Sequence, residues 1–450
     1  MPGTNRSRSA RSLVIRDPLW NTIRLDPVAV QIIDTAAFQR LRYIRQLGLA
    51  HLVYPGATHT RFDHALGVYH LAITGMRVLR EGSTAPPEVW KGGELIPYAA
   101  LLHDIGHYAF SHALEELEPD RIPGDHEEVS ARFFDSPELK AALLPLGEEA
   151  GEEIYRIIMG EADVPLAGLV SGSLDLDKME YLRRDARFCG VPYGEVDVDR
   201  LLQGLLLLQD PQSGAWEVGI HEKAVSAVES LLFAKYQMFR AVYWHHAVRA
   251  ATAMYKRIVE VAVETNLLSP MELVGPTDEE LLYELGRRAA VSDGDVARRL
   301  SDDWLPALRS RRLPKRAVEM SAAELDGVDL PEWVSGDTPR KRRWEDRIAE
   351  ELGLAPGEAI LDFPVKDAMF QLDVLVQRSA HVERLGMDGI PGLIDLPRLA
   401  GELYRTARVL RLFTFQRRVV TPEWLLSRLE DGGDGAGVSE TRDIPVGGVV

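Results

Sequence analysis

Apolar residues recur at intervals of three and four through most of the first 265 residues, and this helical period constrains the fold more than any other feature of the sequence. In the segment 62–79, the apolar side chains on one face are Leu66, Tyr69, Ile73 and Met76. The same reasoning predicts helices over 36–46 and 97–104, and one or two long helices over 218–265, where Gly and Pro are scarce. We therefore expect an all-helical N-terminal part.

The pattern changes near residue 270. Acidic helical segments over 278–308 give way to short β-like runs at 359–363, 372–376 and 409–415, with Pro and Gly between them. We expect a mostly α fold, with a helical core over 1–270 and a smaller C-terminal α+β region over 271–430. The segment 431–450, which is rich in Gly and acidic residues, is expected to be a flexible tail.

Acidic residues outnumber basic ones, 69 to 52, so the chain carries a formal net charge of −17 when His is neutral. This charge repels polyanions at long range, so nucleic acid is not an expected partner, and a phosphate-rich ligand requires local cations or a metal. No run of 18 apolar residues is present, the N-terminal residues lack the apolar core of a secretory signal, and Cys189 is the only cysteine. We expect a cytoplasmic protein without membrane contact.

Several of the twelve histidines lie near the predicted helix ends. His103 and Asp104 form an adjacent pair at the end of an apolar helix, and such a pair alone is more often structural than metal-binding. Two further ligands, His64 and Asp177, lie at the starts of predicted helices. Two imidazole nitrogens and two carboxylate oxygens suit a divalent ion such as Mn, Fe, Co, Ni or Zn, and they leave coordination positions open for water and substrate.

Four spaced segments resemble those of one family. They are 31–75, 101–115 with the sequence LLHDIGHYAFSHALE, the pair His126 and Glu127, and 173–190 with the sequence SLDLDKMEYLRRDARFCG. In this order they resemble the H…HD…D signature of the HD-domain phosphohydrolases, in the branch of the deoxynucleoside triphosphate (dNTP) triphosphohydrolases. The resemblance is strong over 15–265 and implies that the helical core is an HD domain.

The resemblance implies one divalent ion held by His64, His103, Asp104 and Asp177. The ion is Mn, Fe, Mg, Co, Ni or Zn, and a second Mg²⁺ would accompany the substrate phosphates. The resemblance also implies two active-site histidines, His107 and His126. We choose His126 as the general acid that protonates the departing 5′ oxygen, because an imidazole titrates near neutral pH. Glu115 stands where the vertebrate member of this branch has an aspartate that orients this histidine.

The resemblance also assigns the substrate contacts, which are Gln46, Leu47, Arg61, Lys178, Tyr181, Asp185, Lys235 and Tyr243. Arg61 and Lys178 would bind phosphate oxygens. Tyr181 would stack on the sugar and exclude a 2′ hydroxyl, and Asp185 would accept a hydrogen bond from the 3′ hydroxyl. Lys235 departs from the family pattern, which usually has an arginine there, and lysine does not replace the bidentate contact of arginine to phosphate.

Five residues resemble a nucleotide effector site between subunits, namely Asp34, Gln39, Arg42, Arg311 and Lys315. The first three would read a guanine base, and the last two would bind phosphate from another subunit. Such a site implies a homo-oligomer, a dimer or a tetramer, whose assembly is coupled to nucleotide binding. The alternative, that these residues are ordinary surface charges, stays open.

The sequence thus predicts metal-dependent hydrolysis of a dNTP to deoxynucleoside and triphosphate, with nucleotide regulation. Two other functions stay open. Other HD phosphohydrolases share the metal ligands and act on nucleoside monophosphates, cyclic nucleotides or nucleic-acid ends. A nucleotide-sensing oligomeric module with weak activity is the third interpretation.

Overall fold

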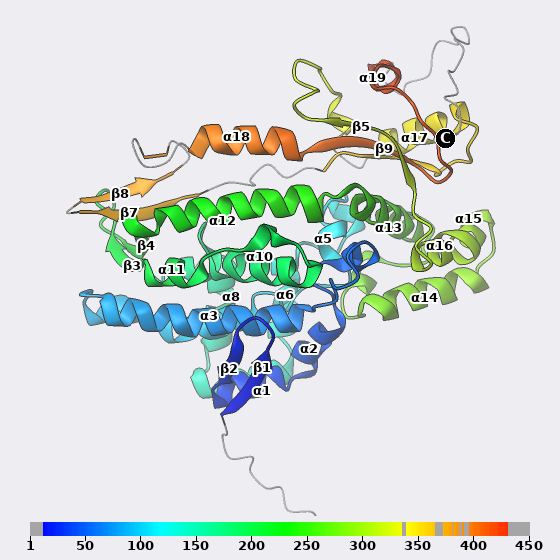
Figure 1. The fold of residues 1–450 in the computed structure, drawn as a ribbon. Coiled ribbons are helices and arrows are strands. Elements are labelled where there is room, and N and C mark those ends of the chain that lie inside the picture. The colour runs from blue at the N-terminus through cyan, green and yellow to red at the C-terminus, as the bar shows by residue number, and fades with distance from the viewer. Residues whose placement is uncertain are drawn as a thin grey trace, which may run out of the picture.

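The computed structural model describes residues 12–334, 339–364, 372–379, 381–386, 389–390 and 396–430. The predicted flexible tail over 431–450 lies outside these residues. Helices dominate the described chain, as predicted for a mostly α fold, and three small sheets accompany them there (Figure 1).

Helices form most of the first 265 residues. They are α1 (Pro27–Ile33), α2 (Ala36–Gln39), α3 (Arg61–Gly82), α4 (Ile96–Leu102), α5 (Ser111–Leu114), α6 (His126–Phe134), α7 (Pro137–Leu143), α8 (Ala150–Ile158), α9 (Gly168–Ser171), α10 (Leu176–Cys189), α11 (Val198–Gln203), α12 (Val225–Met238) and α13 (His246–Glu264). The remaining described helices are α14 (Asp278–Val291), α15 (Asp295–Arg299), α16 (Leu305–Arg309), α17 (Pro339–Glu351), α18 (Leu396–Ala407) and α19 (Pro422–Glu430).

The strands form one hairpin and two larger sheets. They are β1 (Leu13–Asp17), β2 (Asn21–Leu25), β3 (Leu205–Gln209), β4 (Trp216–His221), β5 (Lys315–Ser321), β6 (Ala359–Asp362), β7 (Val374–Arg378), β8 (His381–Leu385) and β9 (Val409–Thr414). β1 pairs with β2, the order of the four-stranded sheet is β3-β4-β7-β8, and that of the three-stranded sheet is β5-β9-β6. The β-like runs predicted at 359–363, 372–376 and 409–415 are thereby confirmed as β6, β7 and β9, within two residues at each end.

The prediction of an all-helical N-terminal part is wrong at two hairpins, β1–β2 and β3–β4. Residues 218–221, which were expected to begin a long helix, belong instead to β4. This strand pairs antiparallel with β3 and parallel with β7, with Gly219 opposite Leu375. An apolar run of this length suits either a buried strand or a buried helix, and here pairing with β3 on one side and β7 on the other makes it a strand.

The helix predicted over 36–46 is also shorter than expected. After α2 the chain makes a 3₁₀ turn over Arg40–Tyr43 and then extends at Ile44. The extended segment pairs with the chain entering α3, since Arg61 N–H donates to the Ile44 carbonyl and Gln46 N–H donates to the His59 carbonyl. Two predicted substrate contacts, Gln46 and Leu47, therefore lie in a loop tied to the start of α3.

Stacked helices form the main core. In Figure 1, α3 lies on one side of α10 and α11, and α12 lies on the other, with α18 packed over α12. α3 begins at a capping box, in which Thr60 and Asp63 each bond to the backbone N–H of the other. Its buried face includes Leu66, Tyr69 and Met76 of the predicted apolar stripe, whereas Ile73 is 43% exposed. The long α3 helix packs against α4, α10 and α11 and contributes many side chains to this core.

Contacts of several kinds cross residue 270, where we placed the boundary between core and C-terminal region. The parallel pair β4–β7 joins strands from both sides, and α13 shares a hydrophobic cluster with α14 and α16. The division into 1–270 and 271–430 stays a prediction.

A buried ionic network on α13 also joins the two regions. The Arg249 guanidinium, 4% exposed, donates two hydrogen bonds to Glu116 at 2.7 and 2.8 Å and two to Asp362 of β6 at 2.6 and 3.0 Å. Lys256 adds a contact of 2.9 Å to Glu116, so two cations neutralise two carboxylates. Buried charges are tolerated because they are paired in this way.

We predict that Arg249→Met destabilises the protein by about 3–5 kcal/mol, because it leaves two buried carboxylates without their main partner. Urea unfolding measures the loss. Arg287→Met is the matched control, since the Arg287 pair with Glu284 is solvent-exposed and its loss is expected to cost at most about 1 kcal/mol. Equal losses in the two variants would contradict the role of the network.

Candidate metal centre and active-site cavity

The four predicted metal ligands lie at the ends of three helices. His64 is in the first turn of α3, and His103 and Asp104 follow directly after α4. Asp177 is the second residue of α10, which begins where the Asp175 carboxylate accepts the backbone N–H of Lys178. Because each ligand sits at a capped or terminated helix, its backbone position is set by the helix packing.

The ligand atoms converge on one point. The Nε2 atom of His64 lies 2.9 Å from Oδ1 of Asp177, 3.2 Å from Nε2 of His103 and 3.8 Å from Oδ2 of Asp104. The Nε2 atom of His103 lies 3.3 Å from Oδ1 of Asp104. With metal–ligand distances of about 2.1 Å, neighbouring ligand atoms around one ion are expected roughly 3.0–3.4 Å apart. The structure therefore brings three members of the predicted quartet, His64, His103 and Asp177, close enough together to hold a single ion, and Asp104 lies beside them.

Hydrogen bonds on the far side of each imidazole direct its Nε2 atom toward this point. His103 Nδ1 lies 2.9 Å from the Ala100 carbonyl, which can only accept, so Nδ1 carries the proton. His64 Nδ1 lies 2.7 Å from Glu180. Burial alone would raise the pKa of Glu180, but Arg184 and His64 lower that pKa to about 2, so Glu180 is an ionised acceptor. Both histidines thus present Nε2 as a metal ligand, and the donor set fits a divalent ion.

The carboxylates of Asp177 and Glu180 favour the protonated form of His64. Burial disfavours a charged His64, but its hydrogen bonds to Asp177 and Glu180 raise the His64 pKa to about 10. Metal binding at this nitrogen would therefore displace a proton.

Glu180, which is fully buried, belongs to a hydrogen-bonded network that the sequence analysis missed. Its Oε1 atom accepts Arg184 Nε at 2.7 Å and Trp20 Nε1 at 2.9 Å, and Arg184 also donates to Asp17 at 3.0 Å. Space for Glu180 exists because residue 67 is glycine: a Cβ atom there would lie 2.0 Å from Glu180 Oε1. Residue spacing was the signal in the sequence that could have indicated this network. Gly67 lies three residues after His64, and Glu180 lies three residues after Asp177, so each shares a helix face with a predicted ligand.

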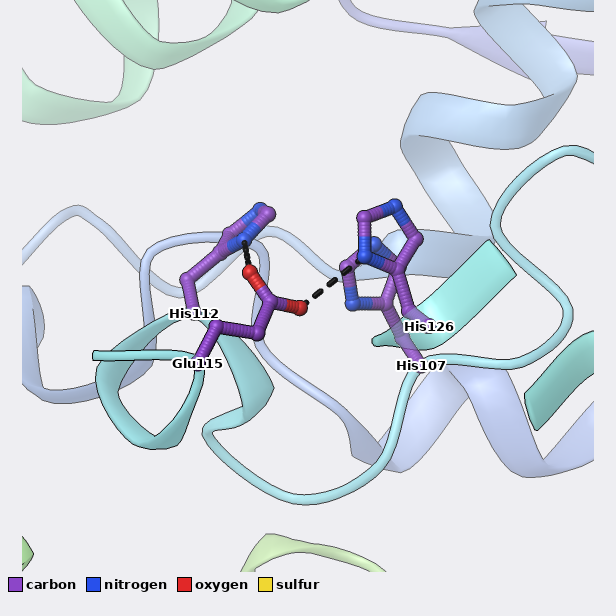
Figure 2. A group of neighbouring side chains, drawn as sticks. All are labelled: His107, His112, Glu115 and His126. Carbon is purple, nitrogen blue, oxygen red and sulfur yellow. Dashed lines mark hydrogen bonds and ion pairs between the residues drawn. The ribbon is translucent and has the colours of Figure 1, made fainter. Parts of the chain in front are cut away.

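A second polar cluster adjoins the metal ligands. The rings of His107 and His126 stack at 3.7 Å between centroids, and Figure 2 shows the Glu115 carboxylate lying between His112 and His126. Glu115 is 2.9 Å from His126 Nδ1 and 3.0 Å from His112 Nδ1. His107 Nε2 lies 3.1 Å from Asp104, which connects this cluster to the quartet. His112 was not among the predicted site residues, although it lies in α5, three residues before Glu115, the residue that ends this helix.

The two stacked histidines differ in their affinity for protons. Burial and the nearby Arg61 hold the His107 pKa well below its usual value, so His107 is neutral. Burial also opposes charge on His126, but the hydrogen bond and charge of Glu115 raise the His126 pKa above its usual value. A pair of adjacent groups whose pKa values are pushed apart is the arrangement that acid–base chemistry needs. The nitrogens and oxygens of this cluster also lie close enough to share an ion.

One cavity of about 940 Å³ opens over both clusters, and this volume suits a ligand of nucleotide size. Each predicted catalytic and substrate-binding residue lines it: Gln46, Leu47, Arg61, His107, Glu115, His126, Lys178, Tyr181, Asp185, Lys235 and Tyr243. Arg61 contacts Asp104 at 2.8 Å, and Lys178 pairs with Asp175, so both cations are held beside the quartet. The roles of these residues toward a substrate stay predictions.

The loop that carries Asp104 and His107 is clamped from two sides. The half-buried Arg40 guanidinium donates to the carbonyls of Ile105 and His107, at 2.8 Å each. On the other side, a Cβ atom on Gly106 would lie 2.0 Å from the His126 carbonyl, so only glycine allows this approach. The clamp sets how His107 and His126 stack. Arg40 was missed because neither its sequence position nor its neighbours indicate which carbonyls it meets.

The five predicted effector residues all lie in the described part of the chain and outside the lining of this cavity. Arg42 donates to Gln39 at 2.8 Å and lies over the Phe62 ring, and Asp34 ends α1. Arg311, which has a φ of 60°, donates to the Leu52 carbonyl at 2.5 Å, and Lys315 begins β5. The effector role and the oligomer stay predictions.

A search of the described helices finds none with the length and apolar character of a membrane span.

We predict that Gly67→Ala weakens metal binding by about 10–100-fold, because the new methyl group displaces Glu180 from His64. Metal content after dialysis against increasing concentrations of a chelator measures the effect. Gly75→Ala on the same helix is the control, since a Cβ atom there meets only Leu205 and Leu202 at 3.4 and 3.7 Å. Unchanged metal affinity in Gly67→Ala would show that Glu180 does not orient the ligand.

Comparison with known proteins agrees with this geometry. Residues 196–389 match the family model described as HD associated region. The chain is 34% identical over 342 residues to the uncharacterized protein MJ1154 of Methanocaldococcus jannaschii, covering 76% of this chain and 67% of MJ1154. It is 25% identical over 414 residues to the human deoxynucleoside triphosphate triphosphohydrolase SAMHD1, covering 84% of this chain and 64% of SAMHD1.

A solved structure of a phosphohydrolase from Bacteroides thetaiotaomicron has the same fold, with a TM-score of 0.68 and 21% identity over 90% of this chain and 100% of that one. The chain spans between 42% and 67% of the length of the curated relatives that it matches. The chain therefore belongs to the family of MJ1154, contains an HD-associated region over 196–389, and shares the fold of the phosphohydrolase structure.

Proposed function

We propose that this protein is a metal-dependent hydrolase that converts a dNTP to the deoxynucleoside and inorganic triphosphate. One observation carries the proposal: three residues of the quartet, the stacked pair of His107 and His126, and the cations and tyrosines predicted to contact substrate all line a single cavity. The distant similarity to SAMHD1 supports the choice of a dNTP as substrate.

His64, His103, Asp104 and Asp177 would hold the metal. A divalent ion there would supply Lewis acidity toward the phosphate and toward water. Arg61 and Lys178 would bind phosphate oxygens, which is how an acidic protein can hold a polyanion.

The reaction breaks the bond between the α-phosphorus and the 5′ oxygen, while water adds to the phosphorus. The departing oxygen needs a proton, because an alkoxide is a poor leaving group. His126 would donate this proton from Nε2, since Nδ1 is bonded to Glu115. Neutral His107 lies against the His126 ring, so it adds no second charge to repel the imidazolium.

Tyr181 and Tyr243 would enclose the sugar. Their ring centroids are 6.5 Å apart in an edge-to-face arrangement, and both line the cavity. A 2′ hydroxyl would meet the packed face of Tyr181, which is a steric basis for preferring deoxynucleotides. We further propose that Asp34, Gln39, Arg42, Arg311 and Lys315 bind a regulatory nucleotide in an oligomer.

Product analysis tests the proposed function. Incubation of the protein with each dNTP and Mn²⁺ or Mg²⁺ should yield deoxynucleoside and inorganic triphosphate on ion-exchange chromatography. His103→Ala is expected to lower turnover at least about 100-fold together with metal content, whereas His221→Ala, outside the cavity lining, should not. Pyrophosphate with nucleoside monophosphate as products would refute the cleavage position, and no turnover of any dNTP would favour the other HD substrates.

The role of Glu115 predicts a pH effect. His126 must be protonated to act as the acid, so turnover falls as pH rises through its pKa, which Glu115 raises. Glu115→Gln keeps a hydrogen-bond acceptor but removes the charge, so the His126 pKa should fall. The alkaline limb of the kcat profile is therefore expected to move to lower pH by about one unit or more. Glu148→Gln, an exposed change, is the control, and an unmoved limb would exclude His126 as the acid.

A further inference from the structure

His59 is a buried histidine that the proposed reaction does not use. It lies immediately before Thr60, the N-cap of α3, and its side chain is fully buried. The imidazole packs on the Phe188 ring with centroids 4.7 Å apart. Its Nε2 atom lies 2.8 Å from Oδ1 of Asp185, a residue that lines the cavity.

Asp185 is held by two donors. The Tyr243 hydroxyl donates to its Oδ2 atom at 2.6 Å, and His59 donates to Oδ1. The Nδ1 atom of His59 is buried and has no hydrogen-bond partner among the described residues. A carboxylate oxygen can only accept, so Nε2 carries the proton that His59 donates to Asp185. Each carboxylate oxygen has room for one more hydrogen bond, so Asp185 can still accept from a ligand.

The backbone of His59 holds a second part of the same subsite. Its carbonyl accepts the Gln46 N–H at 3.1 Å, and Arg45 and Thr60 form a β-bridge beside it. Gln46 and Leu47 face the cavity. One residue therefore connects the loop of Gln46 to the Asp185 carboxylate on α10.

We propose that His59 is a positioning residue that sets the preference for a 3′ hydroxyl on the substrate. This inference rests on the proposed dNTP hydrolysis. By donating to Oδ1, His59 fixes the carboxylate of Asp185 with its free lone pairs toward the cavity, where they accept the 3′ hydroxyl. Without His59, Asp185 keeps only the Tyr243 contact and can rotate away from the sugar.

The test compares the dNTP that is hydrolysed fastest with its 2′,3′-dideoxy counterpart. Wild type should show a higher kcat/KM for the dNTP. In His59→Leu the ratio of the two kcat/KM values should fall about tenfold, the size expected for a charge-assisted hydrogen bond. His59→Gln, which can still donate to Asp185, should recover most of the ratio, and His221→Leu is the control. The dideoxy substrate isolates the 3′ contact, because general damage to the fold lowers both rates alike.

A ratio in His59→Leu equal to that of wild type would overturn the inference and leave dNTP hydrolysis intact. Absence of dNTP turnover by the wild type would instead refute the proposed function, and the inference with it. If His59→Leu does not fold, His59→Asn replaces it, because its shorter amide does not span the distance to Asp185. Retention of the wild-type ratio in that variant would equally overturn the inference.

Discussion

The hydrogen bond between His64 and the buried carboxylate of Glu180 is the interaction on which the centre of this molecule depends. A carboxylate without exposure to water needs cationic partners, and Arg184 supplies one while itself requiring Asp17. The N-terminal hairpin is thereby bound to the metal centre through charge as well as through packing. Gly67 makes the arrangement sterically possible, so a single absent methyl group on α3 decides how a metal ligand is oriented.

Charge pairing also connects the C-terminal region to the cluster of His107, Glu115 and His126. Arg249 on α13 links Asp362 of β6 to Glu116, which is the neighbour of Glu115. Arg40 clamps the loop of His107 from the other side. The stacked pair of His107 and His126 is therefore held by cations from two distant parts of the chain. Burial and Arg61 lower the pKa of the first ring, whereas Glu115 raises that of the second against the effect of burial, so the two pKa values are pushed apart.

The residues that bear chemistry could be predicted because they lie at helix ends marked by short motifs. His64, His103, Asp104 and Asp177 were predicted as metal ligands in this way. The structure brings the ligand atoms of His64, His103 and Asp177 close enough together to hold one ion, with Asp104 beside them. The residues that orient them were missed. Glu180, Arg40 and His59 are ordinary polar residues in sequence, and their roles depend on which backbone or side chain the fold brings to them.

The sequence by itself determined the helical character of the core, the later strands and the set of residues that carry chemistry, because periodicity and spacing are local properties of the chain. Only the tertiary structure decided that residues 218–221 form a strand, since β7 lies more than 150 residues away. It likewise decided which buried charges are paired, and therefore which histidine has a lowered pKa and which a raised one. Such pairing depends on distances in space, and these follow from how the helices pack.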